Sequence, residues 1–545
     1  MTRTCLDSGT GGRTPVNDPM ITPKRALLAA LAAVIAFLLL TAPQAGASAF
    51  YVRQCDVVAN GNTVPYTADA TFSARGGFEG SNQCGSNSFA SGLTVFSANA
   101  TEIGASGQFN WLAPNGMDFL GYGATISFNS DRGEIPYLLS GVNGSGYHPP
   151  LASGATSGYT GVGGSLPAGT NVLTMMLACQ GSCPDTANGF ANGYGFTFAL
   201  RDQVAPTAPA VGGSLFSGGW KNGTYGVTAS TSDDQAGLQY VDLYVNGARI
   251  SRDDLSSSCS TRNGWIDRFR PCPASHTLTR DYATDSNHGF AQGANTVTSC
   301  AYDYTQDGAP NSACTPSTVQ VDTVAPGAVS GLGVTDGPGW RAVNDFDLSW
   351  SNPPQAHAPI EGFYYRVSKV GGGYDSGAQY VSGAAQSLSD LTMPSAGEYQ
   401  VKVWLRDAAG NQSESNAQAQ TVRFDPTVPP PSEAEFDGWI RRNDFEYTAE
   451  WDEVPAGQLG PSGLDGYAVS VSRDPATDPC VTPEDRNPSC SGSEINNDGI
   501  GDTKMPVAER EEGDWFIHVA PVTGAGVKAP VEHTPMPVDT TDPET

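Results

Sequence analysis

The sequence has few positive charges, few histidines and almost no long apolar runs. Lys and Arg together number 28 against 56 Asp and Glu, so the chain carries a formal net charge of −28. Without a basic face a protein cannot displace counterions from phosphates, and this shortage argues against nucleic acid as a partner. The 6 histidines do not alternate with cysteines at ligand spacing, which argues against a zinc site.

The sequence also lacks the common catalytic motifs. It contains no Gly-x-Ser-x-Gly elbow, no His-Glu-x-x-His pair and no Gly-rich phosphate loop. We therefore predict a protein that is not an enzyme. The alternative is an exported polysaccharide hydrolase with its site in residues 50–202, where Asp131 and Glu134 could form a carboxyl pair about 5 to 9.5 Å apart. In an Asp-Arg-Gly-Glu sequence, the same two acids are more often part of a solvated turn.

Only one apolar run stands out, the 15 residues from Ala26 to Leu40, and a membrane-spanning helix needs about 20. Lys24 and Arg25 precede this run, and small residues follow it as far as Ala49, with cleavage plausible after Ala47 or Ala49. This order is typical of a secretory signal. We predict a signal peptide at residues 1–49 and an extracellular or cell-surface protein. The alternative is an uncleaved N-terminal anchor, which would be the only contact with a membrane.

Gly and Pro are abundant, at 65 and 39 residues, which indicates a turn-rich β protein. Four times an aspartate is followed by a proline four positions later, in stretches that suit the edge of a domain. These aspartates stand 120, 103 and 114 residues apart, each interval about the size of one small β-sandwich; they are Asp202, Asp322, Asp425 and Asp539. We call these stretches joints and predict that they divide the chain into domains.

The segment between the second and third joints has the clearest pattern. The stretch from Leu391 to Tyr399, a following Val-x-Val strand and a turn from Asp407 to Asn411 together resemble a fibronectin type III or bacterial immunoglobulin-like domain. The resemblance implies that Tyr399 occupies the tyrosine-corner position and that Trp350 is a core tryptophan. In the next segment Trp515 replaces the corner tyrosine, so the sequence does not decide whether the hydrogen bond of a tyrosine corner forms there.

The last three segments together resemble the tandem immunoglobulin-like or fibronectin-like arrays of exported actinobacterial proteins. We therefore predict an all-β chain with four sandwiches in a linear array. The domains are a jelly-roll-like sandwich at 50–202, an immunoglobulin-like domain at 203–321, fibronectin-III-like domains at 322–424 and 425–538, and a further joint or frayed tail at 539–545. A joint with no domain after it suggests a longer array or a short tail.

Ten cysteines follow the signal segment and fall in even groups between the joints, which favours disulfides within domains. Four cysteines allow three pairings, so the pairs in the first two segments are open. The preferred pairs are Cys55 with Cys84, Cys179 with Cys183, Cys259 with Cys272, Cys300 with Cys314, and Cys480 with Cys490.

Sugar binding requires exposed aromatic faces with a few polar groups beside them. The first segment supplies candidate residues, which could equally be core or rim residues of a sandwich. They are Trp111, Tyr122, Tyr137, Tyr147 and Tyr159. The predicted partner is an extracellular polysaccharide or a cell-wall glycan.

No cofactor is required by the sequence, although calcium has two candidate positions. The four joint aspartates could bind it, the alternative being that they cap turns beside proline. A loop from Glu494 to Gly499 loosely matches a calcium loop, but Met505 occupies the place of the bidentate glutamate. The alternative there is an Asn-Gly-rich hairpin.

Together these observations predict an exported or cell-surface protein in which three sandwich domains form a stalk for an N-terminal domain that binds carbohydrate. The polysaccharide hydrolase and a purely structural surface protein remain as alternatives.

Overall fold

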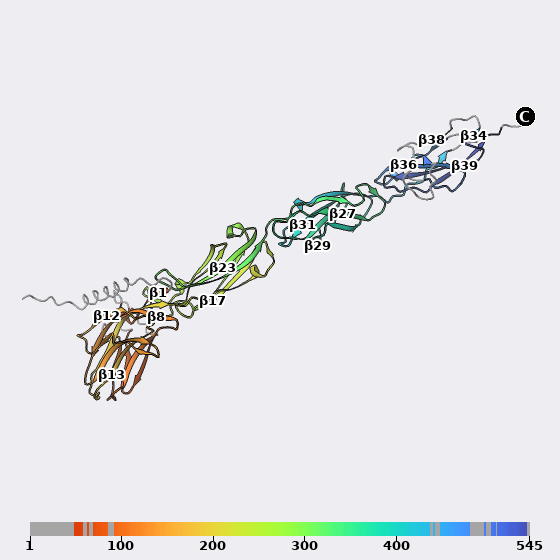
Figure 1. Cartoon of the computed structure of the whole chain (residues 1–545). Helices are drawn as coiled ribbons and strands as arrows, with labels where there is room; N and C mark the ends of the chain where they lie inside the picture. Colours follow the sequence, from red (N-terminus) through yellow and green to blue (C-terminus); the bar gives the residue numbers. More distant parts are fainter. Residues whose placement is uncertain are drawn as a thin grey trace, which may run out of the picture. The chain divides into compact units, whose positions relative to one another are not determined.

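The computed structural model describes residues 48–541, apart from 58–62, 65–68, 85–91, 436–439, 442–446, 480–494, 497–502 and 508–509. The predicted pair Cys480–Cys490 and nearly all of the predicted signal lie outside the described residues, as does the loop from Glu494 to Gly499 apart from Ile495 and Asn496. Within the described part, no helix is long and apolar enough to cross a membrane. Apart from five short 3-10 turns, its regular elements are β-strands, and the all-β prediction is confirmed (Figure 1).

The N-terminal domain is a sandwich of two sheets. The first sheet contains, in order, β12 (Thr160–Ser165), β8 (Met117–Asn129), β14 (Phe190–Asp202) and β1 (Ser48–Gln54), with β6 (Leu93–Ser97) also on β14 and β5 (Phe78–Asn82) on β6. The second contains β10 (Gly146–Tyr147), β9 (Glu134–Val142), β13 (Val172–Cys179), β7 (Ser106–Leu112) and β4 (Ala70–Arg75), with β11 (Ala152–Ser153) also on β9. A short ribbon joins β2 (Asp56–Val57) to β3 (Thr63–Val64).

The first strand begins at Ser48, two residues before the predicted start of the domain. Ser48 pairs with Asp202 of β14 and is fully buried. Of the two predicted cleavage positions, only the one after Ala47 would leave this strand whole.

The three later domains repeat one topology, apart from a hairpin inserted in the second. In chain order, strands one, three and six form one sheet, and strands two, eight, seven, four and five form the other. In the second domain the first of these sheets contains β15 (Ala210–Gly212), β17 (Thr224–Ser232) and β22 (Ser275–Ala283). The other sheet contains β16 (Trp220–Lys221), β24 (Ser312–Val321), β23 (Gly293–Asp303), β18 (Leu238–Val245) and β19 (Ala248–Asp254).

The third and fourth domains follow the same order. In the third domain the first sheet contains β25 (Ser330–Val334), β27 (Phe346–Ser351) and β30 (Ser387–Leu391). The other sheet contains β26 (Trp340–Arg341), β32 (Gln418–Phe424), β31 (Gly397–Asp407), β28 (Ile360–Lys369) and β29 (Gln379–Ser382). In the fourth domain the first sheet contains β33 (Ala434–Glu435), β35 (Tyr447–Trp451) and β38 (Lys504–Val507). The other sheet contains β34 (Ile440–Arg441), β40 (Glu532–Asp539), β39 (Gly513–Thr523), β36 (Leu464–Ser472) and β37 (Ile495–Asn496).

Local patterns in the sequence account for many of these elements. Asn246 and Gly247 take φ values of 50° and 82° and connect β18 to β19 as a two-residue hairpin turn. Along β31 the alternate residues Tyr399, Val401 and Val403 are fully buried, as expected of a strand with one face on a core. Trp350 is 5% exposed, which confirms it as a core tryptophan.

The tyrosine corner is present in the third domain and is reproduced by a tryptophan in the fourth. The Tyr399 hydroxyl donates to the Ser395 carbonyl at 2.9 Å. In the fourth domain the Trp515 ring nitrogen donates to the Glu511 carbonyl at 2.8 Å, also four residues upstream. Both side chains therefore make the corner hydrogen bond, Tyr399 with its hydroxyl and Trp515 with its ring N–H.

Tyr399→Phe keeps the buried ring and removes only the donor. We expect it to lower the free energy of unfolding of the third domain by about 1 kcal/mol, the usual net contribution of one hydrogen bond. Chemical denaturation of the full chain measures this change, and Tyr374→Phe, at an exposed tyrosine in the same domain, is the control. A loss equal to that of the control would show that the corner bond contributes nothing.

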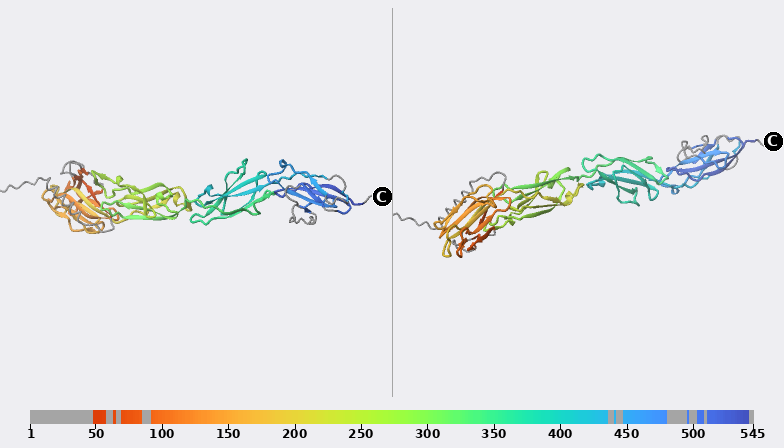
Figure 2. Two further views of the ribbon diagram at one scale, coloured as in Figure 1. Left: turned by 90° about the horizontal axis from the view of Figure 1, so that it is seen from above. Right: turned by 60° about the horizontal axis from the view of Figure 1, so that its bottom comes forward.

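The first two domains pack as one compact unit, which contains residues up to 218 and 224–319. Figure 1 shows β1 and β8 on the side of the first domain that faces the second, and both views of Figure 2 show these two domains side by side. Here the inserted hairpin, β20 (Thr261–Arg262) and β21 (Trp265–Ile266), extends the first domain's sheet, and Ile266 pairs in parallel with Val52. The segment from Cys259 to Cys272, which we call the plug, belongs to the second domain in sequence.

Phe269 is the centre of the plug. It is 2% exposed and packs edge-on against Phe119 at 5.4 Å and Phe198 at 5.2 Å, both in the first domain. The disulfide between Cys259 and Cys272 closes the plug at its base. Residues beyond the first joint therefore complete the core of the first domain.

Candidate functional site

The predicted sugar-binding aromatics occupy three different environments. Trp111 is fully buried, packs on Phe196 and Phe198, and donates its ring N–H to Gln54. Tyr122 is only 7% exposed. The expectation that these two rings offer exposed faces is wrong, because both lie on the inner side of the sandwich, where large aromatic rings fill a core.

Tyr137 and Tyr147 lie together on the outer face of the second sheet. Tyr147 pairs with Gly141, and β9 alternates, so both tyrosines share the side opposite the core. Tyr147 is 47% exposed. Tyr159 is 46% exposed but packs edge-on against Tyr194, beside the first sheet. The structure therefore places two of the five predicted residues on the same face of the second sheet.

A polar network connects Tyr147 to this outer face. The Thr174 hydroxyl lies 3.2 Å from the Tyr147 hydroxyl and donates to the Asn110 side chain at 2.8 Å. Asn110 also accepts from Gln108 at 3.1 Å and donates to Ser73 at 3.3 Å. These bonds join β13, β7 and β4, and they hold amide and hydroxyl groups beside an exposed ring before any ligand binds. We call Tyr137, Tyr147, Asn110, Gln108 and Ser73 the outer-sheet patch.

A second candidate surface is a groove of about 480 Å³ between the first domain and the plug. Leu112 and Pro114 line it from one side, and Arg268 and Arg270 line it from the other. Both arginines are exposed. At the inner end, Asp69 accepts from the Phe269 amide at 3.0 Å, and burial raises the pKa of its carboxyl.

The two acids considered for hydrolysis both bind backbone amides. Asp131 accepts from the Asn188 amide at 2.8 Å, and Glu134 accepts from the Gly189 amide at 2.9 Å. Glu134 is 1% exposed, so it is not part of a solvated turn. Together the two carboxylates anchor one loop to the turn between β8 and β9.

The described cysteines form four disulfides, which are the four predicted pairs within the first two domains. They join Cys55 to Cys84, Cys179 to Cys183, Cys259 to Cys272, and Cys300 to Cys314. Such bonds persist in oxidising compartments, so they indicate an extracellular protein.

All four joint aspartates cap a turn. Each accepts a hydrogen bond from the amide two residues later, at 2.9 to 3.0 Å; the acceptors are Asp202, Asp322, Asp425 and Asp539. The turn-capping alternative is therefore confirmed at every joint. The first three also accept a second hydrogen bond, from a backbone amide in a loop of the domain that follows. The donors are Ala236, Ala358 and Ser462. Each of these joints is thus tied to the next domain by one carboxylate.

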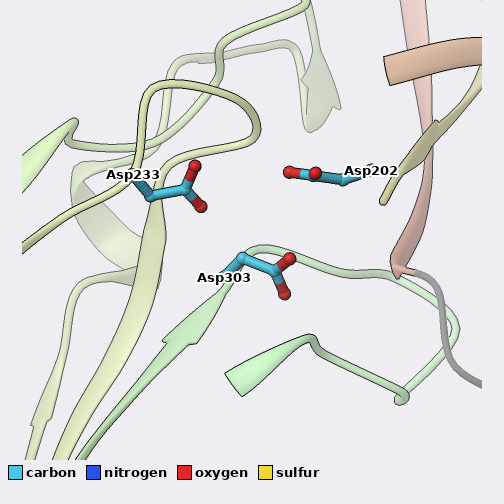
Figure 3. Close-up of side chains that lie close together, drawn as sticks. All are labelled: Asp202, Asp233 and Asp303. Atoms are coloured by element: carbon cyan, nitrogen blue, oxygen red, sulfur yellow. The ribbon is translucent and has the colours of Figure 1, made fainter. Parts of the chain in front are cut away.

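The first joint differs from the others, because two further acids converge on it. Asp202, Asp233 and Asp303 are at most 3% exposed, and one carboxylate oxygen of each lies within 4.8 Å of those of the others. In Figure 3 the carboxylates of Asp202 and Asp233 face each other, and that of Asp303 lies below them. Asp202 ends β14, Asp233 follows β17 and Asp303 ends β23, so three strand ends from two domains build the cluster. We call these three residues the joint triad.

The hydrogen bonds around the joint triad are unevenly distributed. Asp303 accepts from the Ser48 hydroxyl at 2.6 Å and from the Asn311 amide at 2.6 Å. Asp233 Oδ1 accepts from the Gln235 amide at 2.8 Å. Its Oδ2 atom is buried and makes no hydrogen bond of normal geometry, although the Gly237 amide lies near enough to lower the pKa of the group slightly.

Burial raises the pKa of all three carboxyls in the joint triad. The pKa of Asp202 rises to about 6 and that of Asp303 to about 7, in each case chiefly through loss of solvent. Neighbouring aspartates add to the effect, since Asp233 acts on both groups and Asp202 acts on Asp303. Burial also raises the pKa of Asp233, assisted by Asp234. The charged groups that shift these pKa values are themselves aspartates.

Asp202 is one of the joint aspartates that the sequence pattern identifies, whereas Asp233 and Asp303 are not part of that pattern. One signal could have found Asp303, because it ends the strand that precedes β24 just as Asp407 ends the strand that precedes β32. Asp233 has no such counterpart in the third domain, where Asn352 follows the corresponding strand, although Asp452 follows that strand in the fourth domain. Its position in the cluster depends on the fold of the second domain.

By fold, the chain is a modular protein of tandem immunoglobulin-like and fibronectin-III-like sandwiches. No family model and no curated protein matches its sequence. Among solved structures, the FN1–FN3 domains of chicken CNTN1 are similar, with 12% identity, a TM-score of 0.22, and coverage of 61% of this chain and 99% of that one.

A Ca²⁺-stabilised adhesin that helps an Antarctic bacterium bind ice is similar at 14% identity, with a TM-score of 0.32, and coverage of 80% of this chain and 94% of the adhesin.

Proposed function

We propose that the protein is a non-enzymatic, exported surface protein that binds an extracellular polysaccharide or cell-wall glycan with its N-terminal domain. The later sandwiches act as a stalk, and the first two domains act as a stiff tip, since the plug joins their cores. Four disulfides support the extracellular location.

The observation that carries the proposal is the outer-sheet patch. Sugar rings present apolar C–H faces and a rim of hydroxyls, so they suit an aromatic face with amide and hydroxyl groups beside it. Tyr147 supplies an exposed ring that is held by Thr174. Asn110 and Gln108 supply amides that are already ordered by each other, so little conformational entropy is lost when a ligand binds.

Tyr147→Ala should weaken glycan binding by about 5- to 30-fold, because a stacked aromatic contact contributes on the order of 1 to 2 kcal/mol. The measurement is binding of the full chain to an array of bacterial, plant and fungal polysaccharides. Tyr159→Ala is the matched control, since this tyrosine is equally exposed but lies beside the other sheet.

Several outcomes would contradict the proposal. Binding that survives Tyr147→Ala but is lost with Arg270→Ala would move the site to the groove beside the plug. Hydrolysis of chromogenic glycosides that is abolished by Asp131→Asn or Glu134→Gln would establish the hydrolase alternative. Binding to no glycan at all would leave a purely structural surface protein.

A further inference from the structure

We propose that the joint triad, Asp202, Asp233 and Asp303, is a calcium site that fastens the first domain to the second. This site is separate from the outer-sheet patch and does not depend on the glycan-binding proposal. Its evidence is the convergence of three buried carboxylates, together with one carboxylate oxygen that has no hydrogen-bond partner of its own.

The charge of the cluster is the first argument. Three ionised carboxylates in a space where each is at most 3% exposed repel one another strongly. None of the ion pairs found within the described part of the chain includes Asp202, Asp233 or Asp303. A divalent cation at the centre would supply the positive charge that the neighbouring side chains do not provide.

The free oxygen is the second argument. Buried polar atoms in folded proteins nearly always have a partner, and an exception calls for an explanation. Asp233 Oδ2 is such an exception, and in Figure 3 the Asp233 carboxylate points toward the other two acids. The other carboxylates are oriented by bonds from Ala236, Ser48 and Asn311, so the centre is arranged before a ligand arrives.

The chemistry of the donors selects a hard cation. All three donors are carboxylates, with no sulfur or imidazole among them, and oxygen donors suit Ca²⁺ and Mg²⁺. Ca²⁺ binds oxygens at about 2.3–2.6 Å, so its opposite ligands stand about 4.6–5.2 Å apart. Donor atoms within 4.8 Å of one another can therefore share one Ca²⁺. Mg²⁺ usually retains several waters, which a buried cluster accommodates poorly.

Among the described residues, the other joints do not bring three carboxylates together. At the second joint Asp322 lies beside Asp407, but the carboxylate of Asp407 is occupied by the backbone and side-chain amides of Asn411. At the third joint Asp425 accepts bonds from the amide and hydroxyl of Ser462. Among the described residues, the first joint is therefore the place where we expect a cation.

The test is a calorimetric titration of the full chain, stripped of metal with a chelator, with CaCl2 at pH 7.5, followed by differential scanning calorimetry. We expect one equivalent of Ca²⁺ to bind, with a Kd of about 10⁻⁵ to 10⁻³ M. At a hundredfold excess over Kd, the Tm of the first two-domain unit should rise by about 5–10 °C. The transitions of the third and fourth domains should not move.

Asp233→Asn removes one charge and keeps the shape of the side chain. We expect it to weaken Ca²⁺ binding by at least about tenfold while the unit still folds without calcium, since the substitution also removes a buried repulsion. The matched control is Asp407→Asn at the second joint, which should bind Ca²⁺ as the original chain does.

The proposal fails if the chain binds no Ca²⁺ and its thermal transitions do not change. It also fails if Asp233→Asn binds Ca²⁺ with unchanged affinity, because the cation would then lie elsewhere. An equal shift of Tm with MgCl2 at the same concentration would contradict the assignment to calcium.

Discussion

Phe269→Ala lowers the free energy of unfolding of the first two-domain unit by about 3–5 kcal/mol, the usual cost of deleting a buried phenylalanine side chain. The residue belongs to the second domain by sequence, yet its ring packs on Phe119 and Phe198 of the first. The substitution leaves a cavity lined by large rings that cannot close around it. We therefore expect the first domain to lose stability through a change outside its own sequence.

Urea denaturation of the full chain, followed by tryptophan fluorescence, measures this effect, because Trp111 is buried beside the same Phe198 ring. Arg270→Ala is the control, since it changes the exposed residue directly after Phe269 and should alter stability by less than about 0.5 kcal/mol. A loss below 1 kcal/mol for Phe269→Ala would show that the plug does not complete the first core.

The same packing bears on the choice of fragments. A fragment that ends at Asp202 lacks Phe269 and Ile266, both of which are 2% exposed in the complete unit. Glycan-binding experiments therefore need both of the first two domains, which is why the full chain is used in the tests above.

Acidification should destabilise the fourth domain by about 3 kcal/mol between pH 6.5 and pH 4. His518 is fully buried in β39, and burial, with a smaller effect from His533, lowers its pKa from 6.5 to about 4. The folded domain therefore holds His518 neutral, whereas the unfolded chain takes up a proton once the pH falls below 6.5. Unfolding is favoured progressively until the folded form is also protonated near pH 4.

The contacts of His518 explain why its ring cannot ionise easily. Its Nδ1 lies 2.7 Å from His533 Nδ1, and its Nε2 lies 3.0 Å from the Ser472 hydroxyl. A proton added to His518 would place a charge in a buried position beside a second imidazole.

Calorimetry of the full chain over this pH range resolves the transition of the fourth domain. His518→Leu removes the titrating group, so we expect its transition to be nearly independent of pH from 6.5 to 5, where few carboxyls titrate. The same dependence on pH in His518→Leu and in the original chain would show that other groups are responsible.

Much of the fold follows from local patterns in the sequence. The joints predict the spacing of the domains, because proline and a capping aspartate act within a few residues of each other. The alternation from Gly397 to Asp407 predicts β31, and Asn246-Gly247 predicts its hairpin, since both depend only on neighbouring residues. The cysteines in the first two segments pair with near neighbours in sequence, which made their preferred pairs correct.

Only the tertiary structure could decide which aromatic rings are exposed. Trp111 and Leu112 are adjacent on β7, and alternation places them on opposite faces, but it does not say which face meets the other sheet. The structure buries Trp111 and leaves Tyr147 exposed. The corner bond made by Trp515 is another such case, because a ring nitrogen happens to reach the carbonyl that a tyrosine hydroxyl would have reached.

The sequence by itself therefore determined the all-β class and the joints, and it favoured the local disulfides, because each depends on residues close together in the chain. The plug and the joint triad were decided by tertiary structure alone. Phe269 reaches rings that lie 150 and 71 residues earlier, at Phe119 and Phe198. Asp202, Asp233 and Asp303 meet only because three strands end at one junction, and no local pattern encodes where separate strands end in space.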